Sequence, residues 1–202
     1  GIRDRSPSRG LGDVYKRQAM EQEGAVRLQP AEVDRLTREA ITAVGEGAHR
    51  HDVPVKGFLG QDASVLARAV AKSVTEETEF LFAETDETSP FVSVEQMMPF
   101  VPFVRCRNVD EAIDKAKQYE HGFRHTAIIH STNVRNMTRM GRVMDTTLFV
   151  KNGPCFSALG VGGEGYLSYS IATPTGEGVT TPLTFTRERR CSMIDELCIL
   201  GK

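Results

Sequence analysis

Short apolar runs alternate with amphipathic segments along this chain, and this alternation limits the possible folds more than any other feature of the sequence. In chain order, the expected elements are helices at 30–44 and 62–70, a strand at 79–83, a helix at 108–120, a strand at 126–130, a helix at 133–144 and a strand at 147–150. Strands that are separated by helices at this spacing connect through right-handed crossovers and lie parallel. The sequence therefore predicts an α/β fold with a mostly parallel sheet flanked by helices.

Three of the expected helices have a predicted apolar face, and the face of the helix at 62–70 comprises Val65, Leu66, Ala69 and Val70. Pro30 suits the first turn of the first helix, where a backbone N–H has no partner, and Gly45 marks its end. The apolar face of this helix comprises Val33, Leu36, Ala40, Ile41 and Val44. The face expected for the helix at 133–144 comprises Val134, Met137 and Val143.

The composition excludes several classes of protein. Of the 202 residues, 40% are hydrophobic and 26% are charged, which is typical of a soluble globular protein. The net charge of -2 provides no global attraction to nucleic acid or to an anionic membrane. No apolar run approaches the roughly 18 residues of a membrane span. The four cysteines form no CxxC pair, so reduced thiols in a cytosolic protein are expected.

The first 18 residues differ from the rest of the chain. They carry several arginines and show neither helical nor strand periodicity. The string resembles a translated sequencing adaptor, of the kind found at the ends of assembled gene fragments. We therefore interpret residues 1–18 as a non-native or disordered leader and leave them out of the fold. The alternative is a basic disordered arm that binds an acidic partner.

A glycine-rich segment, residues 151–178, follows the last expected strand. A loop of this kind at the end of a buried strand lets the backbone approach a ligand closely. The run GVGGEG from Gly160 fits the dinucleotide fingerprint GxGxxG, but that fingerprint needs a helix to follow. Here the next residues alternate like a strand, and Pro174 would stop a helix. We therefore expect a loop that shapes the mouth of a substrate site.

Cys155 lies in this loop, and the residues alone leave two interpretations of it open. It is either a thiolate nucleophile with loop amides as its oxyanion hole, or a small side chain that lines a pocket. His125 and His130 are the candidate bases, although both adjoin an expected buried strand, where neutral hydrogen-bonded histidines are the safer expectation. His121, His125 and Cys155 do not have the spacing of a zinc site, so no metal is expected.

Glu95 precedes an apolar stretch that begins at Met97. An acidic residue in this position either caps a local turn or binds a ligand rich in donors, such as a ribose diol. The residues alone favour the turn.

Six motifs then occur in one fixed order. They are EQMMP from Glu95, HTAIIHS from His125, FVKNGPC from Phe149, GVGGEG from Gly160, ATPTGEG from Ala172 and FTRERRC from Phe185. From about Ala19 to the end, the chain resembles the C-terminal half of the CoA-acylating aldehyde dehydrogenases of ethanolamine and propanediol utilisation.

The resemblance implies an oxidoreductase that converts a short-chain aldehyde, CoA and NAD to acyl-CoA and NADH through a cysteine thioester. In this family the nucleophilic cysteine lies upstream of the segment that matches Ala19 onward. No catalytic residue is therefore expected in this chain, and the chain alone is expected to be inactive. Residues 19–180 would form part of the catalytic domain of the aldehyde dehydrogenase fold.

The same resemblance implies roles for five residues. Glu95 matches the glutamate that accepts hydrogen bonds from the nicotinamide ribose, and Met97 lies where many relatives place an aromatic side chain against the nicotinamide. Cys155, Phe156 and Val161 match residues that line the aldehyde pocket, so Cys155 would not be the nucleophile.

The tail, residues 181–202, resembles an extended strand that adds to the sheet of a neighbouring subunit. A homo-oligomer is expected on this basis, with no nucleic-acid or membrane partner. The expected location is the cytoplasm, and enclosure in a bacterial microcompartment is compatible with the family. Two alternatives stay open: a non-catalytic binding or assembly module, and the aldehyde half of a bifunctional aldehyde–alcohol dehydrogenase.

Overall fold

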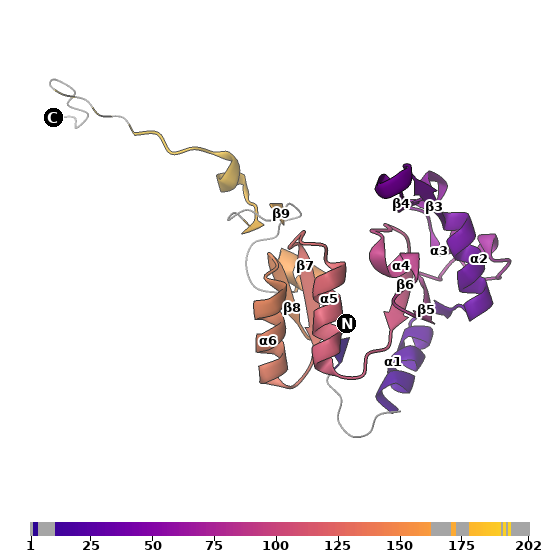
Figure 1. Ribbon diagram of the computed structural model, residues 1–202. Helices are drawn as coiled ribbons and strands as arrows, with labels where there is room; N and C mark the ends of the chain where they lie inside the picture. The colour runs from indigo at the N-terminus through magenta and orange to yellow at the C-terminus, as the bar shows by residue number, and fades with distance from the viewer. Residues whose placement is uncertain are drawn as a thin grey trace. The chain divides into compact units, whose positions relative to one another are not determined.

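The computed structural model of this chain divides into two compact units, and each is described by itself (Figure 1). One unit comprises Asp4–Tyr119, and the other comprises Glu120–Lys202 together with Gly1–Arg3. The structure describes residues 2, 3, 11–162, 171, 172, 178–190, 192 and 194. The boundary falls inside residues 19–180, which the sequence analysis assigned to one domain.

The Asp4–Tyr119 unit is built on a parallel sheet of three strands in the order β2-β5-β6. These strands are β2 (Val26–Arg27), β5 (Leu81–Thr85) and β6 (Phe100–Val104). Pro102 lies within β6, which is an edge strand among the described residues of the unit. An edge strand tolerates proline because the missing N–H removes no bond that the sheet needs.

Among the described residues of this unit, four helices accompany the sheet, and two of them share one cluster of buried residues with it. They are α1 (Leu11–Gln22), α2 (Pro30–Ala40), α3 (Ala63–Ala69) and α5 (Val109–Tyr119), with the single turn α4 (Pro90–Ser93) between β5 and β6. Leu36 of α2 and Leu66 of α3 are fully buried in one cluster with Leu81 of β5. This cluster is the core of the unit.

The expected helix at 30–44 ends earlier, at Ala40, which corrects the prediction. Residues Ile41–Val44 instead form β3, which pairs antiparallel with β4 (His51–Pro54). The β-branched side chains in this stretch favour extended backbone and gain cross-strand partners in the ribbon. Gly45 does not end the helix but begins the turn of the ribbon. Its φ is +84°, and a Cβ there would lie 2.4 Å from the carbonyl oxygen of His49.

The start of α2 is held by Glu32. Its carboxylate accepts the backbone N–H of Gln29 at 2.6 Å and the ammonium of Lys72 at 2.9 Å. Burial alone would raise the pKa of Glu32, but these two donors outweigh burial and leave the pKa below its usual value. A carboxylate with a lowered pKa stabilises the fold above the usual carboxylate range, and this contribution is lost as the pH falls through the lowered pKa.

The second unit also contains a parallel sheet of three strands, in the order β1-β7-β8. These are β1 (Ile2–Arg3), β7 (Thr126–His130) and β8 (Leu148–Lys151). Helix α6 (Val134–Met144) connects β7 to β8, as the alternation of elements predicts (Figure 1). The two parallel sheets and their helices confirm the predicted α/β fold class.

The buried face of α6 differs from the predicted face. Val134 is exposed, whereas Met140 and Met144 are buried. The other two residues of the predicted face are half-buried. A Cβ at Gly141 would lie 3.2 Å from the ring of Phe149, so α6 packs against this ring of β8 at the glycine.

Parts of the segment 1–18 have regular structure among the described residues. Ile2 and Arg3 pair with β7, and α1 begins at Leu11. Arg17 of α1 lies 3.2 Å from the carboxylate of Glu84. The non-native origin of this segment stays a prediction.

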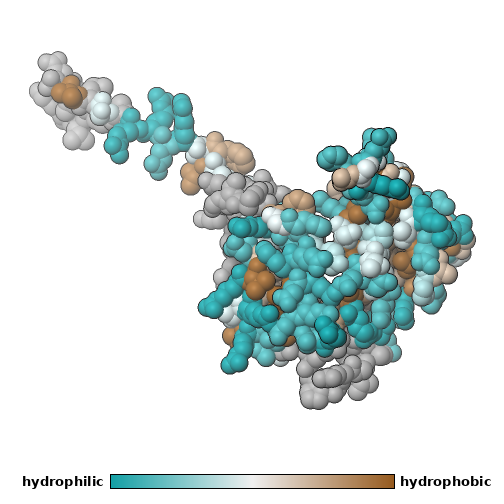
Figure 2. Space-filling view, in the orientation of Figure 1, coloured by the Kyte–Doolittle hydropathy of each residue, from teal (hydrophilic) through white to brown (hydrophobic). Residues whose placement is uncertain are grey.

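The tail strand is not confirmed among the described residues. β9 (Ile171–Ala172) and β10 (Gly178–Val179) form a short antiparallel pair, and Pro182–Phe185 then form a 3-10 turn, η4. The hydroxyl of Thr184 accepts the N–H of Thr181 within this turn. Leu183 and Phe185 lie open to solvent. Figure 2 shows hydrophobic atoms followed by a hydrophilic run along this part of the chain. Among the residues that the structure describes, no helix has the length and apolar character needed to cross a membrane.

Candidate functional site

The carboxyl ends of β7 and β8 meet at one edge of their sheet, because the two strands are parallel. This edge is where α/β proteins commonly bind ligands. β7 ends at His130, and β8 leads through Asn152 into the 3-10 turn η3 (Cys155–Leu159). The turn therefore begins directly at the edge.

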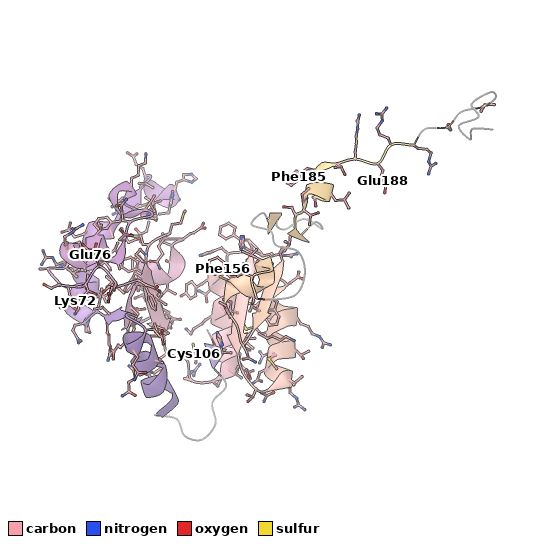
Figure 3. The ribbon with its side chains drawn as sticks, turned by 180° about the vertical axis from the view of Figure 1, so that it is seen from behind. Lys72, Glu76, Cys106, Phe156, Phe185 and Glu188 are labelled. Atoms are coloured by element: carbon pink, nitrogen blue, oxygen red, sulfur yellow. The ribbon has the colours of Figure 1, made fainter. Side chains whose placement is uncertain are left out.

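Three predicted pocket residues come together in and after this turn. The N–H of Val161 donates to the carbonyl of Phe156 at 3.1 Å, and Gly160 closes the turn with a φ of +93°. Phe156 and Val161 are 57% and 46% exposed, and Cys155 is half-buried. The side chain of Phe156 is labelled in Figure 3. The turn therefore presents an apolar surface with a thiol beside it, which suits a small apolar substrate better than a charged one.

Asn152 fixes the point at which the chain leaves the sheet. Its side-chain Oδ1 accepts the N–H of Ser131 at 2.8 Å, and its Nδ2 donates to the carbonyl of Ser131 at 2.9 Å. Its φ is +57°, a left-handed conformation that asparagine tolerates better than most residues. The Asn-Gly pair at 152–153 is a known turn signal, but the sequence alone does not indicate that Asn152 bonds to Ser131.

The other two predicted site residues, Glu95 and Met97, lie in the Asp4–Tyr119 unit. Between them, Gln96 turns inward and donates from its Nε2 to the carbonyl of Phe91 at 3.0 Å. Met97 has a φ of +44°, and its carbonyl accepts the N–H of Gly60. These two hydrogen bonds hold the backbone around Gln96 in place. Glu95 and Met97 are both exposed, and the exposed fraction of Met97 is 72%.

The structure thus groups the five predicted residues into two sets. Cys155, Phe156 and Val161 form one set in the second unit, and Glu95 and Met97 form the other set in the first unit. The roles of the two sets stay predictions.

The candidate bases are both exposed. Nδ1 of His125 lies 2.6 Å from the hydroxyl of Thr126, and His130 is the last residue of β7. In the part of the chain that the structure describes, no group of three or more His, Cys, Asp or Glu side chains could hold a metal ion. Most of the run from Gly163 to Glu177, including the end of GVGGEG and most of ATPTGEG, lies outside the described residues.

No family model matches the chain, but individual proteins do. An acetylating acetaldehyde dehydrogenase, EutE of Salmonella typhimurium, is 44% identical over 184 residues, which are 90% of this chain and 38% of that protein. The chain therefore spans less than two fifths of the length of this relative.

The chain is also similar in sequence and in fold to several solved structures. Propionaldehyde dehydrogenase of Rhodopseudomonas palustris with bound propionyl-CoA is 40% identical, with a TM-score of 0.80 over 91% of this chain and 39% of that one. An engineered glycolyl-CoA reductase with bound NADP+ is also 40% identical, with a TM-score of 0.79 over 89% and 40% of the two chains. A propionaldehyde dehydrogenase from the Clostridium phytofermentans fucose utilisation bacterial microcompartment is 36% identical, with a TM-score of 0.77 over 94% and 41%.

Proposed function

Over nine tenths of its length this chain is homologous to the CoA-acylating aldehyde dehydrogenases, and we propose that it forms the C-terminal part of such an enzyme. The reaction converts a short-chain aldehyde, CoA and NAD to acyl-CoA and NADH. The observation that carries the proposal is the agreement between the sequence identity and the fold over the same nine tenths of the chain.

The chemistry needs a thiol that is not in this chain. A cysteine thiolate adds to the aldehyde carbon, hydride leaves that carbon for the nicotinamide, and the thioester that results is cleaved by the thiol of CoA. The last step regenerates the enzyme thiol, and it exchanges one thioester for another. The family resemblance matches Cys155 to a residue of the pocket wall. It puts the nucleophilic cysteine upstream of the segment that matches Ala19 onward, in polypeptide outside residues 1–202.

Glu95 and Met97 are suited to a nicotinamide nucleoside. The exposed carboxylate of Glu95 accepts hydrogen bonds, and the two hydroxyls of a ribose donate them. The exposed thioether of Met97 offers a soft apolar contact for a flat ring. The side chain of Gln96 is bonded inward, which leaves its two neighbours available to the ligand.

The wall of the aldehyde pocket is the second contribution of this chain. Phe156 and Val161 remove the alkyl group of the substrate from water, and Cys155 adds a small polarisable contact. A larger side chain at any of the three would narrow the range of aldehydes accepted. The acetaldehyde and propionaldehyde dehydrogenases among the relatives support a short-chain aliphatic aldehyde as the substrate class.

Assembly and location complete the proposal. Leu183 and Phe185 are exposed on the tail beside the charged run Arg187–Arg190, and a second copy of the protein would bury them in a homo-oligomer. A cytoplasmic enzyme enclosed in a microcompartment is supported by the relative from the Clostridium microcompartment.

The proposal is tested by assaying two proteins with propanal, CoA and NAD. The complete protein, extended upstream of Ala19, is expected to form NADH and propionyl-CoA in equal amounts. The chain of residues 1–202 is expected to form neither product, because it lacks the thiol that forms the acyl bond. Turnover by residues 1–202 alone would refute the assignment of Cys155 to the pocket wall.

A further inference from the structure

Asn152 extends the pairing of β7 and β8 beyond the end of both strands. The last backbone pair in the register joins Ile129 and Lys151. The N–H of Asn152 then donates to the carbonyl of Ile129 at 2.9 Å, and the side-chain amide of Asn152 bonds both backbone groups of Ser131. If β8 continued, its backbone would bond the N–H and the carbonyl of Ser131. The side chain of Asn152 makes these two hydrogen bonds instead.

The residue type at 152 is closely restricted by these contacts. Ser131 is 7% exposed. If Asn152 were replaced, the N–H and the carbonyl of Ser131 would therefore lose their hydrogen bonds to the amide without gaining equivalent bonds to water. An amide side chain carries its acceptor and its donor on two separate atoms, which matches the two backbone groups of Ser131, whereas an aspartate would lack the donor. Asparagine is also the shorter amide and tolerates the φ of +57° observed here.

The two hydrogen bonds between the side chain of Asn152 and the backbone of Ser131 form a clamp. This clamp sets the direction of the turn Cys155–Leu159, which we call the pocket turn. With its side chain bonded to Ser131, Asn152 bends the backbone out of β8, and three residues later η3 begins with Cys155. Inside the turn, the hydroxyl of Ser157 donates to the carbonyl of Pro154 at 2.7 Å. The turn is therefore closed internally, and Asn152 is the residue that joins it to the sheet edge.

We propose that Asn152 is a positioning residue that sets the orientation of the Cys155–Leu159 turn and, through it, the shape of the aldehyde pocket. The part about the pocket rests on the proposed function, whereas the part about the turn does not. Asn152 itself has no contact with substrate in this account.

The first test measures amide hydrogen exchange in the chain of residues 1–202. The N–H groups of Gly160 and Val161, which are bonded to carbonyls inside the turn, report its opening. Asn152→Ala and Asn152→Asp are expected to speed their exchange about tenfold, because two hydrogen bonds of ordinary strength are lost or weakened. Asn152→Gly removes the amide but accepts the positive φ, so it should give the same acceleration without added backbone strain.

Ser131→Ala is the matched control. It removes the hydroxyl, which accepts the N–H of Asn133, but it leaves both backbone groups that Asn152 uses. Exchange at Gly160 and Val161 should stay within about twofold of the original chain, since the clamp is intact. Unchanged exchange in all three Asn152 variants, or equal acceleration in Ser131→Ala, would overturn the proposal.

The second test separates the pocket from the turn. In the complete enzyme, Asn152→Asp should raise the KM for propanal about tenfold and leave the KM values for CoA and NAD within about twofold. An unchanged KM for propanal beside faster exchange would overturn the part about the pocket. If the complete protein shows no aldehyde-dependent activity, the proposed function fails, and the exchange result still decides the role of Asn152 in the turn.

Discussion

Replacing Leu36 with alanine is expected to lower the free energy of unfolding of the Asp4–Tyr119 unit by about 3 kcal/mol. Leu36 is 0% exposed and lies in the cluster of buried residues that joins α2 to α3 and β5. Truncation removes buried methyl groups and leaves a cavity that the surrounding helices only partly fill. Urea unfolding followed by the far-UV circular dichroism of the helices measures the loss, since the chain has no tryptophan.

Leu183→Ala is the control for this substitution, because it removes the same atoms from a side chain that is 78% exposed. Its effect on the same transition should stay within about 0.5 kcal/mol. Equal losses in the two variants would mean that α2 does not pack against the sheet as described.

The substitutions Glu95→Gln and Glu95→Ala are each expected to lower kcat/KM for NAD in the complete enzyme by about 10- to 100-fold. Hydrogen bonds to an ionised group contribute about 1.5–3 kcal/mol each, and both substitutions remove the charge. Glu95→Gln keeps the size of the side chain, so its loss isolates the contribution of the carboxylate. A larger isotope effect with aldehyde deuterated at the carbonyl carbon would show that hydride transfer has become slower.

Glu76→Gln is the matched control, because Glu76 is also an exposed glutamate of the same unit (Figure 3). It should leave kcat/KM for NAD within about twofold. If Glu95→Gln behaves like Glu76→Gln, Glu95 serves a local turn, as the isolated residues suggested, and does not bind the ribose.

The elements around the pocket turn were largely predictable from the sequence. The strand at 126–130 has the predicted bounds, and the strand before the turn differs from the prediction by one residue at each end. In this region a capped helix lies between two short apolar runs, and Asn133 accepts the N–H of Asn136 as an N-cap residue does. Local signals and tertiary structure agree here, so local signals were sufficient.

The segment at 30–44 was not predictable from periodicity alone. Ile41 and Val44 continue the apolar spacing of α2, so the pattern cannot distinguish a longer helix from a strand. The deciding interaction is the pairing with His51–Pro54, which lies beyond any local window. The tail is a related case, because a strand at an edge is defined by its partner.

The candidate site was only partly predictable from its residues. Local sequence favoured a turn at Glu95, and only the fixed order of six motifs assigned it to the ribose. Asn152 and Gln96 were missed because their importance depends on bonds to Ser131 and Phe91, which no spacing rule reveals. Periodicity identifies elements, whereas side chains that fix loops are found from three-dimensional contacts.

The central claim is that the acyl bond forms on a cysteine outside residues 1–202, and locating the acyl group tests it most directly. The complete protein is incubated with propionyl-CoA without NADH, digested at low pH to preserve thioesters, and analysed by peptide mass spectrometry. A propionyl group is expected on a cysteine upstream of Ala19, and Cys155 is expected to be unmodified. A propionyl group on Cys155, lost in the variant Cys155→Ala together with all turnover, would contradict it.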